Sequence, residues 1–340
     1  MRPSRGVSLA LRVALIYNDP IPDRYSQMGE ADAVADVLEE VKAVYDALLE
    51  MGHSVIKVPL VPPIDNVRTI LAGMDADIFF NLFEGFAGQP ETEAMVAGMM
   101  AAMGKAFTGS PAPTLALALD KVKTKELLIA AGVNTPRYQV LYPHTVGSFN
   151  MKFPCIVKPA AEDASHGVDQ HSVVNDKESL LAQVEKICAH YGGIALVEEF
   201  LDGRELSSTI MGIRKPILLS ISEIVFSLPP GLPKMLTFGA KWLTDDIYFH
   251  HTDPVCPAKV DDALWAHISE VSIAAYRLLG CRGYARVDMR LDAEGRASVL
   301  EVNPNPDISV TSGAVRQASA IGLTYPQFVD RIMQLAFDKE

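Results

Sequence analysis

The stretch VLEVNPNP, residues 299–306, decides the fold, and the run YARVDMRL at 284–291 lies just before it. Both runs are apolar enough for buried strands, and the polar segment DAEGR between them predicts a turn. Residues two apart on a strand point to the same face, so Glu301 and Asn303 share one face. A hairpin in this register brings Asp288 beside both of them.

These three residues form a candidate Mg²⁺ site. Two carboxylates and an amide oxygen are hard ligands, and Mg²⁺ takes one or two carboxylates and leaves its other positions to water and nucleotide phosphates. The acids interrupt apolar strands instead of lying in the turn, which favours a site over a surface hairpin that happens to carry acids. The pattern therefore predicts a metal site that works together with a nucleotide.

Length and composition predict a globular chain without a polyanion-binding surface. The 340 residues exceed one ordinary core, so two or three subdomains are expected. Hydrophobic residues make up 49%, and no low-complexity segment appears. The net charge of −12 argues against binding to nucleic acid or to an anionic membrane. An anionic substrate would have to be held by a few focused cations.

The cysteines and the N-terminal residues predict a cytoplasmic protein. The four cysteines are far apart and show no CxxC spacing, which is typical of free thiols in a reducing compartment. Arg12 interrupts the first apolar run and no small-residue cleavage site follows, so LRVALIY predicts a strand instead of a signal peptide. No apolar run approaches the ~18 residues that span a membrane.

Strand and helix patterns alternate through residues 11–110. Strands are expected at LRVALIY, SVIKV and DIFFNL, and helices at 31–50, ending at Met51-Gly52, and at 91–104. This β-α-β-α order predicts a parallel, doubly wound sheet with helices on its faces. We expect a Rossmann-like α/β domain to span residues 1–117.

The remainder of the chain predicts two α+β subdomains, at 118–212 and 213–340. The first contains a helical connector, the strand FPCIVKP, the loop AAEDASHG, a helix and two strands. The second contains a Pro-rich loop, a strand MLTFGAKW, a long helix, the acidic hairpin and a closing helix. The expected elements, the hairpin aside, lie at 113–132, 153–159, 176–190, 194–200, 205–211, 235–242, 261–279 and 325–337.

Two further motifs fit a nucleotide site, although neither is specific alone. In FPCIVKPAAEDASHGVDQ, Lys158 ends an apolar strand beside a small-residue loop whose backbone N–H groups suit phosphate oxygens, without a Walker pattern. In ALVEEFLDGREL, a strand turns at Asp202-Gly203 and presents Glu205, which suits ribose hydroxyls. The alternatives are a solvated lysine and an ordinary hairpin.

Taken in this order, the motifs resemble the ATP-grasp superfamily and, within it, the D-alanine–D-alanine ligase family. The resemblance covers about residues 12 to 337 and is most specific in LALALDKVKTKELL and VLEVNPNP. It implies a pre-ATP-grasp domain followed by a two-subdomain ATP-grasp fold that holds ATP. The implied activity joins a carboxylate to an amine through an acyl phosphate, with ADP and phosphate as products.

The resemblance also implies which residues bind ATP and metal. Lys121 and Lys158 match lysines that contact ATP phosphates, Glu205 matches the ribose-binding acid, and Lys241 matches the lysine of a loop that closes over the phosphates. The other expected ATP-binding residues are Ser165 in the small-residue loop and the adenine hinge Glu198, Glu199, Phe200 and Leu201. The family's magnesium ligands match Asp288, Glu301 and Asn303, with two Mg²⁺ ions expected and Mn²⁺ as an alternative.

For catalysis, the resemblance places Arg286 next to the reacting carboxyl group and Ser312 where a serine holds the acceptor's carboxylate. Phosphoryl transfer needs positioning and charge neutralisation more than covalent help. Lys158, Lys241 and Arg286 are therefore expected to stabilise the developing charge. Because an acyl phosphate hydrolyses readily, a lid must exclude water, and residues 227–251 are the candidate.

The amino-acid pocket departs from the family pattern. Glu84-Gly85 replaces a His-Gly pair near the first substrate, which makes Glu84 a candidate catalytic residue, and Trp242 replaces a lid tyrosine. The family's acid for the first amino acid's ammonium has no clear match. The alternatives for that acid are Glu30, Asp36, Glu39 and Glu40.

Asp307 is the sharpest departure, because it stands where the family has a glycine of the oxyanion hole. If its carboxylate faces the substrate, it disfavours D-alanine as acceptor and favours a cationic or neutral polar group; otherwise it caps the turn that follows. A ligase for small amino-acid or carboxylate and amine substrates is the leading hypothesis, D-alanine-specific or for another acceptor. An ATP-grasp kinase and a silent nucleotide-binding scaffold are the alternatives. A homodimer through the Met-rich helix at 91–103 is also expected.

Overall fold

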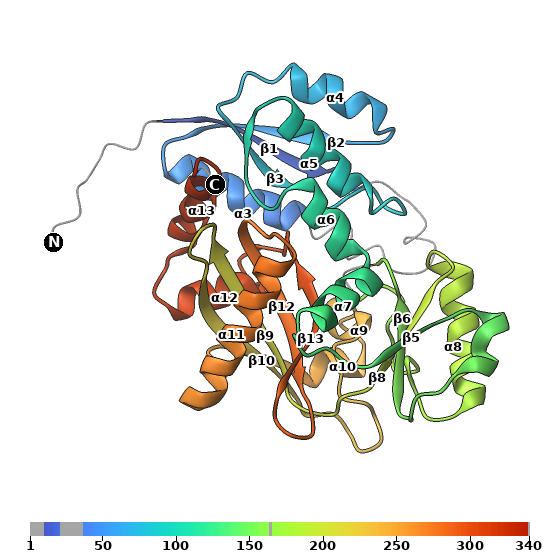
Figure 1. The fold of residues 1–340 in the computed structure, drawn as a ribbon. Coiled ribbons are helices and arrows are strands. Elements are labelled where there is room, and N and C mark those ends of the chain that lie inside the picture. Colours follow the sequence, from blue (N-terminus) through green and yellow to red (C-terminus); the bar gives the residue numbers. More distant parts are fainter. Residues whose placement is uncertain (1–9, 21–36, 163–164, 339–340) are drawn as a thin grey trace.

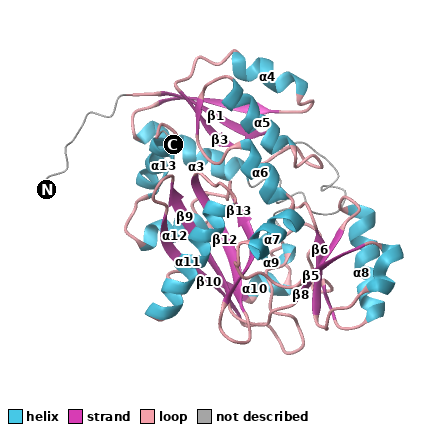
Figure 2. Cartoon of the chain, in the orientation of Figure 1, coloured by secondary structure: helices cyan, strands magenta, loops and turns pink. Residues whose placement is uncertain are grey.

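Three β-sheets form the framework within residues 10–20, 37–162 and 165–338, which are the residues that this computed structural model describes (Figure 1). One sheet is parallel and the other two are antiparallel. Helices lie against each sheet, as Figure 2 shows. The predicted combination of a doubly wound N-terminal domain with two α+β parts is confirmed.

The N-terminal sheet has the strand order β2-β1-β3-β4. Its strand β3 is buried at every position, as expected for a parallel strand covered on both faces. Helix α3 packs on one face, while α4 and α5 pack on the other. The bounds are β1 Arg12–Asn18, α3 Val37–Glu50, β2 Ser54–Leu60, α4 Asp65–Ala72, β3 Ile78–Leu82, α5 Thr92–Ala102 and β4 Ala106–Phe107.

The central sheet has the order β5-β8-β6-β7 and is covered by α8. The predicted helical connector before it consists of two helices, because Asp120 leaves helical geometry and caps the second by accepting a hydrogen bond from the Lys123 N–H. The bounds are α6 Ala112–Leu119, α7 Lys121–Ala130, β5 Tyr138–Leu141, β6 Cys155–Pro159, β7 Val173–Val174, α8 Lys177–His190 and β8 Ala195–Glu199.

The third sheet has the order β11-β10-β9-β12-β13, with α11 on one face and α12 on the other. Strand β9 belongs here, although the predicted segment 118–212 grouped it with the central strands, so the chain changes sheets between β8 and β9. The bounds are β9 Glu205–Gly212, β10 Ile217–Phe226, β11 Thr252–Val255, α11 Asp262–Leu278, β12 Gly283–Leu291, β13 Ala297–Asn303, α12 Gly313–Ala320 and α13 Tyr325–Leu335.

One strand prediction is wrong. MLTFGAKW was expected to be a strand at 235–242, but Phe238–Trp242 forms the short helix α9, and α10 follows at Ile247–His250. The Thr237 hydroxyl caps α9 by accepting a hydrogen bond from the Ala240 N–H at 3.0 Å. A local cap thus prevails over apolar residues that have no strand partner.

The last helix of the chain packs against the N-terminal domain. Helix α13 packs against α3, and residues of α3, β1, β3, α12 and α13 share one hydrophobic core (Figure 1). This contact fixes the N-terminal sheet above β12 and the loop that follows β13. Among the helices of the described residues, none has the length and apolar character needed to cross a membrane. All four cysteines are free thiols.

Candidate active site

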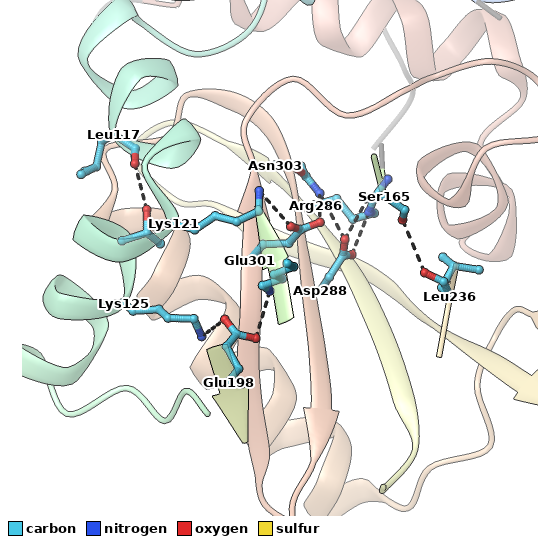
Figure 3. A network of polar contacts seen from close by, with 12 residues as sticks. Leu117, Lys121, Lys125, Ser165, Glu198, Leu236, Arg286, Asp288, Glu301 and Asn303 are labelled. Carbon is cyan, nitrogen blue, oxygen red and sulfur yellow. Dashed lines mark hydrogen bonds and ion pairs between the residues drawn. The ribbon is translucent and has the colours of Figure 1, made fainter. Parts of the chain in front are cut away.

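Strands β12 and β13 bring the predicted metal ligands together (Figure 3). Asp288 pairs with Glu301 across the two strands, and the amide nitrogen of Asn303 lies 3.1 Å from the Asp288 carboxylate and 3.4 Å from that of Glu301. The register shifts just beyond Asp288, where β13 carries the extra residue Leu300. The convergence deduced from the alternating sequence is present, while the role of these residues as ligands remains a prediction.

Arg286 lies on the same face of β12 as Asp288 and forms an ion pair with it. Its Nε and Nη2 donate to the two carboxylate oxygens at 2.8 Å each, a bidentate pair. Burial by itself lowers the pKa of the Arg286 guanidinium, but Asp288 more than offsets this and raises the pKa above its ordinary value. The guanidinium is therefore a fixed positive charge next to the paired carboxylates.

Glu301 lies among four cations that come from four other helices and strands. Lys121 Nζ lies 3.3 Å from its carboxylate. Burial acts to raise the pKa of Glu301, but Lys121, Lys158, Lys241 and Arg286 hold it well below its usual range. Burial lowers the pKa of the Lys241 ammonium, and the positive charge of Arg286 lowers it further. Cations that crowd one carboxylate in this way suit an anionic ligand with several charges.

Glu198 forms a second, fully buried charge cluster. It is 1% exposed and takes Lys125 Nζ at 2.8 Å and Lys158 Nζ at 3.0 Å on its two oxygens (Figure 3). Burial lowers the pKa of Lys125 to about 8 despite Glu198. Lys125 was not predicted, although its spacing of four from Lys121 places both lysines on one face of α7.

The other residues of the predicted adenine hinge differ in their exposure and in their contacts. The side chain of Glu199 is exposed, whereas Phe200 packs against the Arg290 guanidinium, 5.1 Å from its ring centre. Glu205 accepts hydrogen bonds from Arg290 as well. Arg290 was not predicted, yet the alternation in ARVDMRL sets it on the same strand face as Arg286 and Asp288.

The small-residue loop and the candidate lid are in contact. Ser165 has a positive φ of 62°, a conformation that only a few non-glycine residues adopt, and its hydroxyl donates to the Leu236 carbonyl at 3.4 Å. The Phe238 N–H donates to the Val168 carbonyl at 3.0 Å, and the His166 ring lies against that of Phe238. The lid segment that carries Lys241 therefore rests on this loop.

Of the four acids proposed for the first amino acid, Glu40 is buried near the site. Its carboxylate accepts a hydrogen bond from the Ile308 N–H at 2.8 Å, while Tyr325 donates to the Ile308 carbonyl at 2.9 Å. Glu39 is exposed, and Glu30 and Asp36 lie outside the described residues. Glu84 is also exposed. Of the two described candidates, packing of α3 thus buries Glu40 and leaves Glu39 exposed, while the role of either acid toward the first amino acid remains a prediction.

Asp307 is bound to the turn that follows it. Its two carboxylate oxygens accept from the N–H and the hydroxyl of Ser309 at 2.6 and 3.0 Å. These bonds match the alternative in which Asp307 caps a turn, and they do not match a carboxylate held toward an acceptor. Ser312 is buried and caps α12, accepting from the Val315 N–H at 3.3 Å. Its contact with an acceptor remains a prediction.

Comparison with known proteins identifies the family. A family model described as "D-ala D-ala ligase C-terminus" matches residues 127–334, which is more than half of the chain. The chain belongs to the D-alanine–D-alanine ligase family. It is 35% identical over 265 residues to a D-alanine--D-alanine ligase of Xylella fastidiosa, covering 76% of this chain and 81% of the relative. It is 33% identical over 318 residues to the "Uncharacterized protein y4sG" of Sinorhizobium fredii, covering 93% and 89%.

Solved structures show that the D-alanine–D-alanine ligase fold extends over the whole chain. The D-alanine--D-alanine ligase of Bacillus anthracis complexed with ATP has a TM-score of 0.72 at 20% identity, covering 97% of both chains. The VanG D-Ala:D-Ser ligase of Enterococcus faecalis has a TM-score of 0.75 at 20% identity, covering 96% of this chain and 100% of that one. At this identity the likeness shows the fold, and it confirms the predicted ATP-grasp architecture over the whole chain.

Proposed function

We propose that this protein is an ATP-dependent carboxylate–amine ligase that works through an acyl phosphate and releases ADP and phosphate with its amide or dipeptide product. The observation that carries this proposal is the pair Asp288 and Glu301, set side by side on β12 and β13 within reach of Lys121 and Arg286. Such an arrangement suits triphosphate and metal, because it supplies both the acids for the cation and the cations for the phosphates.

The residues present fit Mg²⁺. The side chains of Asp288 and Glu301 are 20% and 29% exposed, so a cation can approach them, and Asn303 adds an amide group to the same face. In this structure the amide nitrogen of Asn303 faces both acids, and rotation of the amide presents its oxygen instead. When bound, Mg²⁺ neutralises phosphate charge and orients the transferring group. We propose two such ions, with Mn²⁺ as a substitute.

The roles of the other residues follow from their positions. Lys121 and Lys158 pair with Glu301 and Glu198 and are proposed to hold ATP phosphates, exchanging these carboxylate partners for phosphate oxygens. Arg286 is proposed to stabilise the negative charge that develops on the reacting carboxyl group. Lys241 belongs to the candidate lid. The contact between this lid and Ser165 is proposed to keep water away from the acyl phosphate. Ser165 is proposed to contact phosphate.

The proposed substrates are an amino acid or other small carboxylate and an amine. The relative in Xylella fastidiosa is named for D-alanine, and the Enterococcus faecalis structure is named for D-Ala:D-Ser ligation. Glu84 and Asp307 distinguish this chain at the amino-acid end, so we propose D-alanine–D-alanine ligation and ligation of another acceptor as two specificities of one chemistry. Asp307 caps a turn, but its negative charge also raises the pKa of Arg286, so both acceptor specificities stay open.

A paired substrate screen tests this proposal. The protein is incubated with ATP, Mg²⁺ and D- or L-amino acids, alone and in pairs, and ADP release and product mass are measured. We expect one carboxylate and one amine to give a product that has lost one water, in step with ADP. Glu294→Gln, an exposed acid in the β12–β13 turn, is the matched control for Glu301→Gln. A phosphorylated product without ligation would instead indicate a kinase.

We also propose a homodimer through the N-terminal domain. Helix α5 carries the exposed Met95, 45% accessible, on a helix of small residues and methionines that otherwise packs into the core. Light scattering at micromolar concentration is expected to give twice the 36.9 kDa mass of the chain, and a monomer mass would reject the dimer.

A further inference from the structure

Arg290 is a buried arginine at the nucleoside end of the site. It is 4% exposed and lies on β12, on the strand face that also carries Arg286 and Asp288. Its Nε and Nη2 donate to Glu205 Oε2 at 3.2 and 2.8 Å, and its Nη1 donates to the Leu201 carbonyl at 2.5 Å. Nη2 also donates to the Lys234 carbonyl. One guanidinium on β12 therefore joins two segments that are far from it in sequence, residues 201–205 and the segment around Lys234.

Each of the three acceptors has its own place in the proposed ATP site. Leu201 belongs to the proposed adenine hinge, Glu205 is the proposed ribose acid, and Lys234 lies within the candidate lid. The guanidinium also lies 5.1 Å from the ring of Phe200 and 6.0 Å from that of Phe226. The turn before Glu205 packs so closely on the end of β12 that a Cβ on Gly203 would overlap the Leu291 carbonyl oxygen.

The carboxylate of Glu205 is oriented so that one of its two oxygens can face a ligand. Within the described part of the chain, the hydrogen bonds to its carboxylate end on Oε2, and its side chain is 15% exposed. Two hydrogen bonds from the buried Arg290 guanidinium to the same carboxylate oxygen fix Glu205 in one orientation. The other oxygen, Oε1, is then available to accept from hydroxyl groups.

We propose that Arg290 is a positioning residue of the ATP site that couples recognition of the ribose to the seating of the lid. By fixing Glu205 it sets the acceptor for the ribose hydroxyls, and by holding the Lys234 carbonyl it ties the candidate lid to the same point. A lysine cannot replace it, because one ammonium lacks the planar fork that reaches the carbonyls and the carboxylate together. This inference rests on the proposed ATP-dependent function.

The test measures nucleotide binding, which needs no knowledge of the amino-acid substrates. Calorimetry in the presence of Mg²⁺ gives Kd for ATP and for 2′,3′-dideoxy-ATP, which lacks both hydroxyls. The variants are Arg290→Met, Arg290→Lys, Glu205→Gln and the double variant Arg290→Met/Glu205→Gln. Arg296→Met is the matched control, because Arg296 also pairs with acids in the β12–β13 hairpin but is 62% exposed.

The lid has its own reporter in the same experiment. The chain contains two tryptophans, Trp242 in the lid and the exposed Trp265 on α11. In a Trp265→Phe background, the fluorescence of Trp242 follows the lid when ATP is added. We expect the wild-type lid to respond to ATP and to respond less to the dideoxy nucleotide, and we expect Arg290→Met to give the same weak response with both.

The expected binding result is a loss of discrimination. Wild type should bind ATP more tightly than the dideoxy nucleotide, and Arg290→Met should weaken ATP binding by about 10- to 100-fold, the scale of hydrogen bonds to a charged group. The preference for ATP should fall to that of Glu205→Gln. The double variant should be no worse than either single one, while Arg290→Lys should lie between wild type and Arg290→Met.

Three results would overturn the inference. An unchanged preference for ATP in Arg290→Met, with only a lower Tm, would show a purely structural arginine. If that variant does not fold, Arg290→Lys with the full wild-type preference would have the same meaning. Equal binding of both nucleotides by wild type would remove the ribose role while the ligase proposal stands, whereas no ATP binding at all would count against the proposed function itself.

Discussion

The proposed nucleotide end and the proposed amino-acid end of this site are built in different ways. At the nucleotide end, Lys121, Lys158, Asp288 and Glu301 project from helices and strands that are fixed by register and packing. At the amino-acid end, the loop after β13 is held by a helix far away in sequence, through the bond from the Ile308 N–H to Glu40. The first arrangement is set by residues that are neighbours within strands and helices. The second depends on the packing of the N-terminal domain against the loop after β13.

This difference leads us to expect that the two ends respond differently to substitution. Substituting a residue of the β12–β13 face disturbs a partly buried charge network, so the cost is high. The proposed amino-acid end is formed by loops from different parts of the chain. These loops accommodate Glu84 and Asp307 without a change of fold. We therefore expect chemistry to be sensitive to substitutions at the first end and substrate choice to respond to those at the second.

Glu301→Gln should have the largest effect. It removes the charge that balances Lys121, Lys158, Lys241 and Arg286 and one proposed ligand of Mg²⁺. We expect kcat to fall by about 10²- to 10³-fold, the scale of losing one electrostatic contact in an active site, or by more. Steady-state ADP release measures it, with circular dichroism to show an intact fold. Mg²⁺-dependent turnover near the wild-type rate would break the distinction between the two ends.

Lys125 gives the buried cluster a dependence on pH. Its pKa is about 8 in the folded chain and near 10.5 when unfolded, so between these values the unfolded state binds more protons and stability rises with pH. At lower pH both states hold the proton, and the burial penalty is fully present.

Comparison with Lys125→Met isolates this effect from that of other groups that titrate at high pH. The free energy of unfolding of wild type, relative to Lys125→Met, should rise between pH 8 and 10 by at most about 3 kcal/mol. Urea titrations at a series of pH values measure it. A difference that stays flat or declines over this range would contradict the assignment of a depressed pKa to Lys125.

Glu40 tests how the amino-acid end is held. Glu40→Ala leaves the Ile308 N–H without its acceptor and should cost about 1–3 kcal/mol of stability. Glu40→Gln keeps an accepting oxygen and should retain most of that stability. If the charge of Glu40 also binds the substrate's ammonium, Glu40→Gln should raise KM for the amino acid while KM for ATP stays the same. Glu39→Gln, on the exposed face of α3, is the control.

Asp307 should have the smallest effect. Asp307→Asn keeps a side-chain oxygen for the turn and should leave Tm and the choice of acceptor unchanged. Asp307→Gly removes both hydrogen bonds and should cost about 1 kcal/mol, read as a lower midpoint in urea. A switch of the acceptor toward D-alanine in Asp307→Asn would show that the charge, and not the turn, governs specificity.

The sequence predicted most of the nucleotide end because the relevant residues follow local periodicities. Asp288, Glu301 and Asn303 follow from strand alternation and a hairpin, and the parallel N-terminal sheet follows from the order of its elements. Arg290 and Lys125 obey the same spacings and were overlooked. Glu40 could not be singled out, because its partner is 268 positions away and depends on the docking of α3. The helix α9 was missed because its Thr237 cap prevails over an apolar pattern that resembles a strand.

The central claim is that this chain activates a carboxylate with ATP. The most direct measurement supplies ATP, Mg²⁺ and a mixture of D- and L-amino acids whose carboxylates carry ¹⁸O, and then analyses the released phosphate by mass spectrometry. Attack of the carboxylate on the γ-phosphate, followed by displacement by an amine, transfers one labelled oxygen to phosphate. We predict phosphate that carries one ¹⁸O. Turnover that releases only unlabelled phosphate, or that leaves the phosphoryl group on the product, would contradict the account.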